Sequence, residues 1–533
     1  MLADVPVADP PSRPLDHEHC YRIASSRDGR FDGTFVVAVT TTGIYCRPSC
    51  PAVTPRRSNV RFYLTPAAAQ GDGFRACKRC RPDAAPGSPE WDIRADAVAR
   101  AVRLIGDGMV GREGVGGLAR RVGYSPRHLT RLLNAELGTG PLRLAMAYRT
   151  QTARALLEGT DLPVTEVAWA SGFNSIRQFN DVIRRVYAQT PGELRRRSAP
   201  APGPDPAPGA MAGPGPGRPG GPGPAVVHAR LAYRPPLDAA ALLGFLGARA
   251  VPGVESYDGS AYTTALRLPG GLGSASISVP TRAGTSPTPW LDCELRLDDI
   301  ADYATAVARL RRLLDLDADP EAVRASLSGD PVLAPLVAAS PGRRMPGTHD
   351  AHELALRAVV GQQVSLAAAR AAGGRLADRF GEPLRWPHAG VVRAFPTARA
   401  LAGADPEDLP LPRTRATSLV RLATAMAQGE LELHPGVDRQ AAHDALLSRP
   451  GIGPWTAAYI RMRALGDPDV MPPGDAAVRR ALTAAGTPPP GPDRSPPARA
   501  ADRRWSPWRS YATAHLWAAA ARPGPAAEKG PDT

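Results

Sequence analysis

Four of the six cysteines lie in two close pairs, and thiolates can bind a metal ion or act as nucleophiles. The pairs are Cys46-Arg-Pro-Ser-Cys50 and Cys77-Lys-Arg-Cys80. Four thiolates suit a tetrahedral zinc ion, which would also stabilise a small domain with few strands. Spacing alone favours a purely structural zinc site over chemistry at the metal.

A second group of residues that could do chemistry lies toward the C-terminus. Leu446 to Ala457 reads LLSRPGIGPWTA, a pattern typical of a helix-hairpin-helix motif. In such a motif the turn between Gly451 and Gly453 lets backbone N–H groups approach a phosphate at a helix start. A carboxylate, Asp475, follows soon after the hairpin. The hairpin alone predicts only non-specific DNA binding, so a binding module without catalysis remains an equal alternative.

Two helix-turn-helix patterns follow the cysteine pairs. Leu118 to Leu133 predicts a helix, a glycine turn, a serine N-cap and a second, basic helix. Val164 to Tyr187 repeats this layout. In the second copy Arg177 and Gln178 are expected to face DNA. The alternative is a generic helical bundle.

The composition fits a nucleic-acid partner. The formal net charge is +14 and the pI about 10.0, which indicates a polyanionic partner, although an Arg-rich protein from a GC-rich genome would look the same. No run approaches the roughly 20 apolar residues of a membrane span, and the N-terminus does not resemble a secretory signal. We therefore expect a cytoplasmic, nucleoid-associated protein without membrane contact. Cys20 and Cys293 are expected to be ordinary buried cysteines.

The cysteine region closely resembles the N-terminal domain of Ada-type adaptive-response proteins. The resemblance rests on the run Phe31 to Cys50, on Asn59-Val-Arg-Phe-Tyr63 and on Gly73-Phe-Arg-Ala-Cys-Lys-Arg-Cys80. It implies that Cys46 accepts a methyl group from a DNA methylphosphotriester, with Cys50, Cys77 and Cys80 as the other zinc ligands. It also implies phosphate contacts by Thr42 and Arg75.

The helix-turn-helix pair, which ends in Thr190-Pro-Gly-Glu-Leu-Arg195, resembles the DNA-binding domain of AraC-type regulators. Its fusion to a zinc methyl acceptor resembles an Ada-type transcriptional activator. The resemblance implies promoter DNA and RNA polymerase as partners of a monomeric protein.

The second half resembles AlkA-type DNA-3-methyladenine glycosylases over most of residues 226–522. The matching segments are Tyr233 to Asp238, Leu243 to Glu255, and Trp505-Ser-Pro-Trp-Arg-Ser-Tyr-Ala512 running on to Trp517. The resemblance implies that Asp475 is catalytic and stabilises an oxocarbenium-like sugar. It also implies an aromatic pocket for a flipped base, formed by Trp455, Tyr459 and Trp508. Gln363 matches the wedge that fills the gap left by the base.

Two further expectations limit the chemistry. Only Cys293 lies in the second half, so a four-cysteine iron–sulfur cluster is not expected. Relatives that cleave the DNA strand carry a lysine where this chain has Trp455, so a monofunctional glycosylase is expected. Two alternatives stay open: a regulator whose second half only grips DNA, and a glycosylase whose zinc domain is merely structural.

The expected fold class is multidomain and mainly α, with α+β parts. Its expected segments are an Ada-type zinc domain of α+β type (15–89), an AraC-type double helix-turn-helix (90–198), a Pro/Gly-rich linker (199–225), an α+β AlkA-type N-terminal domain (226–340), an all-α helix-hairpin-helix glycosylase domain (341–522) and a disordered tail (523–533).

Overall fold

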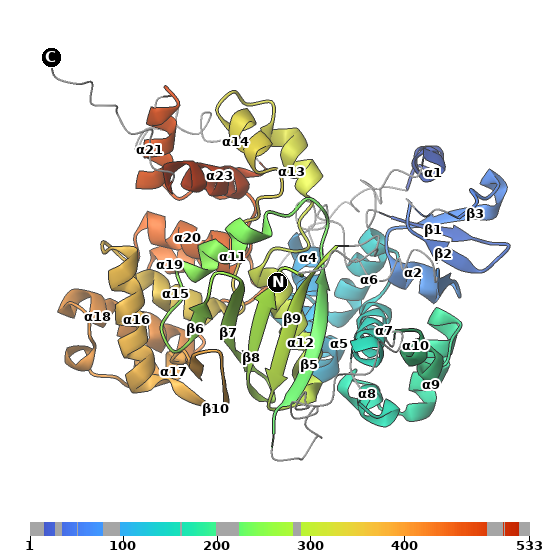
Figure 1. The fold of residues 1–533 in the computed structure, drawn as a ribbon, viewed down its shortest axis with the longest axis horizontal. Helices are drawn as coiled ribbons and strands as arrows, with labels where there is room; N and C mark the ends of the chain where they lie inside the picture. Colours follow the sequence, from blue (N-terminus) through green and yellow to red (C-terminus); the bar gives the residue numbers. More distant parts are fainter. Residues whose placement is uncertain are drawn as a thin grey trace, which may run out of the picture. The chain divides into compact units, whose positions relative to one another are not determined.

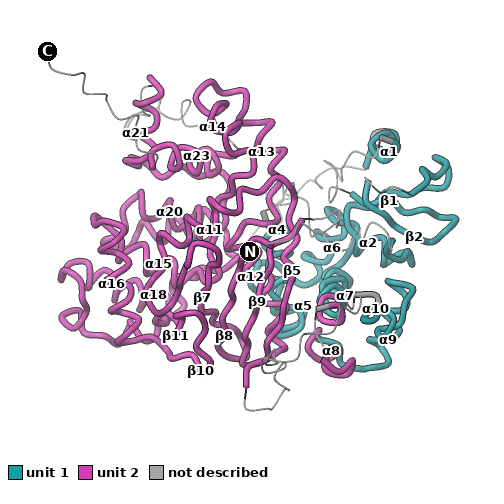
Figure 2. The backbone as a smooth tube through the Cα atoms, viewed as in Figure 1, with its two compact units in different colours: residues 1–154, 172–197 teal, residues 155–171, 198–533 magenta. Residues whose placement is uncertain are grey.

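A computed structural model describes most of the chain (Figure 1). The described residues are 15–26, 35–48, 50, 52–77, 96–159, 162–198, 223–280, 289–487, 505 and 507–521. The expected tail and nearly all of the expected linker lie outside these ranges. Backbone contacts divide the chain into two compact units, residues 1–154 with 172–197 and residues 155–171 with 198–533 (Figure 2). Each unit is described by itself.

The first unit opens with a four-stranded sheet in the order β3-β1-β2-β4. Strands β1 (Val36–Val39) and β2 (Ile44–Cys46) form a hairpin in which β-branched and aromatic residues predominate. The hairpin turn needs a glycine, because Gly43 has a φ of 63°. Strand β3 (Val60–Tyr63) pairs antiparallel with β1, whereas β4 (Arg75–Ala76) pairs parallel with β2.

Helices make up most of the other described residues up to residue 198, of which residues 155–171 are grouped with the second unit. They are α1 (His17–Ser26), α2 (Pro66–Gly71), α4 (Asp96–Gly106), α5 (Met109–Val122), α6 (Pro126–Leu137), α7 (Pro141–Gly159), α8 (Val164–Ala170), α9 (Ile176–Tyr187) and α10 (Pro191–Ser198), with a 3-10 turn η2 (Arg57–Asn59). Ser125 caps α6 and Ser175 caps α9, each accepting a hydrogen bond from the backbone N–H three residues on. Both expected helix-turn-helix starts are therefore present.

The second unit contains a five-stranded antiparallel sheet in the order β5-β9-β8-β7-β6. Its strands are β5 (Ala225–Ala232), β6 (Glu255–Tyr257), β7 (Ala261–Leu268), β8 (Gly271–Ser278) and β9 (Trp290–Leu297). Strand β9 alternates buried and half-buried residues, but β7 is buried along nearly its whole length. The reason is that helices α11 (Ala239–Gly247) and α12 (Tyr303–Leu313) and a second hairpin all pack against β7.

The remainder of the second unit is mainly helical and surrounds two apolar cores. Its elements are η3 (Ile300–Asp302), α13 (Pro320–Leu327), α14 (Leu333–Ala339), α15 (Ala351–Val360), α16 (Leu366–Phe380), α17 (Ala398–Ala402), η4 (Pro406–Asp408), α18 (Arg413–Ala427), α19 (Arg439–Leu447), α20 (Pro454–Ala464), α21 (Ala476–Ala484) and α23 (Arg509–Ala521).

One element of this region was not anticipated by the helical pattern. Strands β10 (Glu382–His388) and β11 (Val391–Ala394) form a hairpin. Its turn residues Ala389 and Gly390 both have positive φ, 48° and 80°, as a tight hairpin turn requires. The hairpin packs against β7 and β8 and so covers part of the five-stranded sheet. Among the described helices, none is both long and apolar enough to cross a membrane.

Candidate functional site

The parallel pairing of β2 and β4 brings two of the predicted zinc ligands together. Tyr45 on β2 is in register with Ala76 on β4. Cys46 and Cys77 each come one residue later, so they are neighbours on adjacent strands. The Cys77 N–H donates to the Tyr45 carbonyl across 2.9 Å and fixes the end of this pairing.

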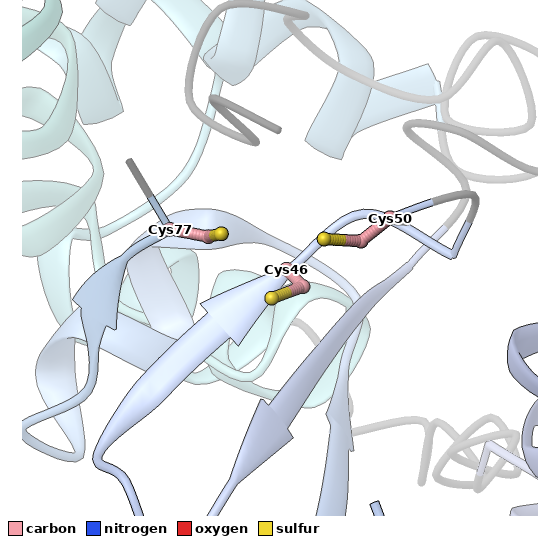
Figure 3. A group of neighbouring side chains, drawn as sticks. All are labelled: Cys46, Cys50 and Cys77. Carbon is pink, nitrogen blue, oxygen red and sulfur yellow. The ribbon is translucent and has the colours of Figure 1, made fainter. Parts of the chain in front are cut away.

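Cys50 completes a group of three thiols (Figure 3). A tight turn brings it back, because its N–H donates to the Arg47 carbonyl at 3.1 Å. The three Sγ atoms lie within 4.8 Å of one another. Tetrahedral zinc with bonds of about 2.3 Å needs sulfur atoms about 3.8 Å apart, so small side-chain adjustments satisfy the geometry. The three residues therefore fit zinc, while the fourth predicted ligand, Cys80, lies outside the described residues.

Thr42 and Arg75 lie together at the other end of the β2–β4 pair. Thr42 is exposed in the turn before β2, and the Arg75 N–H donates to the Gly43 carbonyl at 2.8 Å. Thr42 and Gly43 belong to the turn before β2, and three residues separate Thr42 from Cys46 in the sequence.

Asp475 is a buried carboxylate that accepts four hydrogen bonds. It caps α21, and its Oδ1 accepts from the backbone N–H groups of Ala477 and Val478, both at 2.9 Å. The indole Nε1 of Trp517 also donates to Oδ1, at 3.1 Å. The indole Nε1 of Trp455 donates to Oδ2 at 2.8 Å. These four donors fix the orientation of the carboxylate at the start of the helix.

Aromatic side chains surround this carboxylate. The Trp455 and Tyr459 rings, one helical turn apart on α20, stack with centroids 5.0 Å apart. Tyr459 also meets the Trp517 ring at 6.2 Å, and Trp517 lies parallel to Phe245 at 6.3 Å. These four rings are half-buried, so each keeps some surface open. We refer to Phe245, Trp455, Tyr459 and Trp517 as the aromatic cluster.

Two members of the aromatic cluster were not among the predicted pocket residues. Phe245 and Trp517 come from α11 and α23, far from the hairpin in sequence. The signal that could have found them is their place inside the two segments that carry the AlkA resemblance. Trp508, which was predicted, instead packs edge-on against Tyr511 at 5.5 Å within an apolar core. It forms none of the described ring pairs with Trp455 or Tyr459.

Two arginines contact the cluster at Phe245 and Tyr459. The Arg249 guanidinium lies 3.6 Å from the Phe245 ring centroid, and Arg463 donates to the Tyr459 hydroxyl at 2.6 Å. Burial lowers the pKa of Arg249 to about 10, with the nearby phenol only partly offsetting this. Burial alone would raise the pKa of the Tyr459 phenol, but the charges of Arg463 and Arg249 outweigh it and hold that pKa below its ordinary value. This side of the cluster is therefore electropositive.

The hairpin between α19 and α20 has the open turn that its glycines predict. Gly451 has a φ of 86°, and a Cβ there would lie 2.1 Å from the Ser418 Oγ, so no other residue fits. Gly453 is exposed, and a Cβ there would meet no atom within 4 Å. Helix α20 begins with Pro454, which has no N–H, so the Trp455 and Thr456 amides are the first that a phosphate at the helix start could approach. Gln363 is exposed at the tip of the α15–α16 connection.

The second helix-turn-helix presents its predicted DNA-facing residues to solvent. Arg177 and Gln178 are exposed in the first turn of α9 and line a shallow hollow with Met146 and Arg185. Phe179 and Ile183, on the opposite side of α9, are fully buried. This distribution is the one expected of a recognition helix.

Taken together, these features define a DNA-binding protein with a thiolate-rich metal centre in one half and a helix-hairpin-helix base-excision site in the other. Comparisons with known proteins agree in both halves. Family models match residues 19–83 (metal binding domain of Ada), 118–197 (helix-turn-helix domain), 228–350 (AlkA N-terminal domain) and 356–507 (HhH-GPD superfamily base excision DNA repair protein).

Individual relatives match the whole chain or one half of it. The chain is 49% identical, over 94% of its length and 96% of the relative's, to the probable bifunctional transcriptional activator/DNA repair enzyme AlkA of Mycobacterium tuberculosis. Its second half is 36% identical to DNA-3-methyladenine glycosylase 2 of Escherichia coli, over 54% of this chain and 95% of that protein. Its first half is 40% identical to the bifunctional transcriptional activator/DNA repair enzyme Ada of Escherichia coli, over 29% of this chain and 42% of that protein. The chain therefore belongs to the family of bifunctional transcriptional activator/DNA repair enzymes that join an Ada-type half to an AlkA-type half.

Proposed function

We propose that the chain repairs alkylated DNA by two separate reactions and reports one of them to transcription. The second half hydrolyses the N-glycosidic bond of alkylated bases such as 3-methyladenine. The first half transfers a methyl group from a DNA methylphosphotriester to Cys46. The observation that carries the proposal is the buried Asp475 carboxylate held by two indole N–H groups inside the aromatic cluster.

The geometry suits base excision. As the base leaves, positive charge develops on the sugar, and a fixed carboxylate stabilises it. Three of the four described hydrogen bonds go to Oδ1, so Oδ2 retains more capacity to face the sugar or a water molecule. Trp455 and Trp517, the members of the aromatic cluster other than those that the two arginines contact, offer ring surface suited to a flipped, cationic base.

Strand cleavage does not belong to this function. A lyase reaction needs an amine that forms a Schiff base with the sugar. The segment 226–522 contains no lysine, and Trp455 occupies the position at which strand-cleaving relatives carry one. We therefore propose a monofunctional glycosylase that leaves the abasic strand intact.

The thiol cluster suits methyl transfer. Cys46, Cys50 and Cys77, together with Cys80, would hold one zinc ion, which keeps the thiols ionised at neutral pH. A lone pair of the Cys46 thiolate attacks the methyl carbon, the carbon–oxygen bond of the phosphotriester breaks, and the DNA leaves as an ordinary phosphodiester anion. Thr42 and Arg75 are proposed to orient the phosphate.

This transfer also provides a switch. The cysteine cluster changes from a formal charge of −2 to −1 with zinc bound. For a phosphate about 6 Å away this removes roughly 0.7–3 kcal/mol of repulsion, depending on the local dielectric constant. DNA affinity would rise severalfold to a hundredfold. Arg177 and Gln178 would then read promoter DNA, and the bound monomer would recruit RNA polymerase in the cytoplasm.

One incubation tests both reactions. The full chain is mixed with methylated duplex DNA, and the products are analysed for free bases and for methylated cysteine. We expect released 3-methyladenine and a single methyl group on Cys46. Release without methylation would indicate a glycosylase with a structural zinc domain. Methylation without release would indicate a regulator whose second half only binds DNA.

A further inference from the structure

The loop between α15 and α16 exposes apolar side chains to solvent, although such side chains are usually buried. Gln363 at its tip is exposed and has a left-handed φ of 54°. Val364 and Leu366 are 39% and 44% exposed. We refer to Gly361–Leu366 as the exposed loop. Gln363 has a strained backbone conformation and exposed apolar neighbours. The exposed loop therefore holds one position only if another contact fixes it.

Gln362 supplies this anchor by binding the hairpin. Its half-buried side chain points away from its own loop, and its Nε2 donates to the Gly451 carbonyl at 2.9 Å and to the Thr456 Oγ1 at 3.1 Å. A carbonyl can only accept, so the amide must turn its nitrogen to the hairpin. Both amide protons are thereby used on one neighbouring motif.

The two hydrogen-bond partners of Gln362 lie in different parts of the site, one in the hairpin turn and one on helix α20. Gly451 lies in the turn proposed to hold a phosphate, and this turn is seated closely against Ser418 of α18. Thr456 is buried and directly follows Trp455, whose indole N–H binds Asp475. One side chain therefore connects the exposed loop, the phosphate-binding turn and the helix that carries the aromatic cluster.

An enzyme that flips a base must hold the backbone and fill the vacated stack at the same time. The distance between the two contacts then has to be fixed before DNA binds. We propose that Gln362 is a positioning residue that sets the exposed loop at the correct distance from the hairpin, so that the loop tip enters the duplex while the hairpin holds the phosphate. This rests on the proposed glycosylase function.

The test compares Gln362→Met with a matched control. Methionine keeps the length of the side chain and loses both hydrogen bonds, while Gln428→Met makes the same change at an exposed site at the end of α18. Single-turnover release of 3-methyladenine should fall about tenfold in Gln362→Met and stay unchanged in the control. Binding to undamaged duplex should stay within about twofold of wild type, because the hairpin turn is kept by Gly451 and Ser418. The fluorescence of 2-aminopurine beside a tetrahydrofuran abasic-site analogue should report less unstacking.

A double variant separates positioning from a general loss of stability. Gln363→Ala removes the loop tip, and adding Gln362→Met to it should cause little further loss of base release, since an unpositioned loop no longer uses its tip. The proposal would be overturned if the loss of base release in the double variant equalled the product of the losses in the two single variants. It would also be overturned if Gln362→Met weakened binding to undamaged duplex as much as it slowed base release. If the wild-type chain unstacks the probe but releases no base, the proposed glycosylase function fails, and the fluorescence comparison alone then decides the positioning role.

Discussion

The indole Nε1 of Trp455 lies 2.8 Å from Oδ2 of Asp475, so a side chain that stacks on Tyr459 also orients the carboxylate. Stacking and hydrogen bonding are usually assigned to different residues of a base pocket. Here one indole does both, and any shift of the ring that accommodates a base also moves the donor on Asp475. The proposed base-binding surface and the proposed catalytic group therefore share one side chain.

Trp455→Phe should separate these two roles. Phenylalanine retains a ring to stack on Tyr459 but lacks the N–H that binds Asp475. Loss of one hydrogen bond to a charged group corresponds to about 1.5–3 kcal/mol, so single-turnover base release should fall about tenfold to a hundredfold. Trp290→Phe is the matched control, since the Trp290 indole donates to Asp292 on β9, at 2.9 Å, away from the aromatic cluster. Equal rates for wild type and Trp455→Phe would show that the hydrogen bond does not matter.

Cys46→Ala should abolish methyl transfer, whereas Cys20→Ala should leave it intact. Cys20 is buried, and burial together with the charge of Asp16 raises the pKa of its thiol to about 11, so it is a poor nucleophile at neutral pH. Mass mapping of peptides after incubation with methylated DNA measures both variants. Methyl groups found on Cys50 or Cys77 in the wild type would contradict the assignment.

Asp315 should make the stability of the second unit depend on pH. Burial raises the pKa of this carboxyl from 3.8 to about 7, although the charge of Arg344 and the Tyr511 hydroxyl partly oppose the shift. Between pH 3.8 and about 7, Asp315 is still protonated in the folded state but has lost its proton in the unfolded state. The stabilisation that is fully present below pH 3.8 is therefore lost as the pH rises through about 7. The slope is at most about 1.4 kcal/mol per pH unit.

Asp315→Asn should remove this dependence. Asparagine stays neutral, can still accept from Tyr511, and tolerates the φ of 51° at this position. Relative to wild type, the melting temperature of the variant should therefore increase from pH 5 to pH 8. The control is Asp444→Asn, which makes the same change at an exposed aspartate. If the melting temperatures of wild type and Asp315→Asn change with pH in the same way across this range, the pKa of the Asp315 carboxyl is not raised.

Borohydride should not trap a covalent complex between the chain and DNA. Because residues 226–522 contain no lysine, the abasic product should accumulate uncut and be cleaved only by added alkali. The measurement is gel analysis of the strand with and without alkali. A trapped adduct would show that another amine, such as Lys78, reaches the sugar.

The local patterns of the sequence predicted local structure well. The serine caps of α6 and α9 and the turn at Gly451 follow from short-range chemistry, and each is present. The two cysteine pairs predicted a metal site for the same reason, because each pair is close in sequence. Only the parallel β2–β4 register shows why Cys46 and Cys77 are neighbours.

Contacts between distant segments could not be read in this way. Phe245 and Trp517 join Trp455 only because α11 and α23 pack near α20, and the sequence around each ring is equally compatible with an ordinary core position. Trp508 shows the converse, since its motif is prominent but its ring packs on Tyr511. The β10–β11 hairpin was missed because its burial comes from β7 and β8 and not from its own periodicity.

The central claim is that the chain carries two independent reactions, and Asp475→Asn tests it most directly. Asparagine keeps the shape of the N-cap and loses the charge that stabilises the developing sugar cation. In a single preparation of this variant, 3-methyladenine release should fall by roughly 10²–10³ or more. Methyl transfer to Cys46 from the same methylated DNA should proceed at the wild-type rate. Base release near the wild-type rate would contradict the account, since another carboxylate such as Asp469 would then have to act.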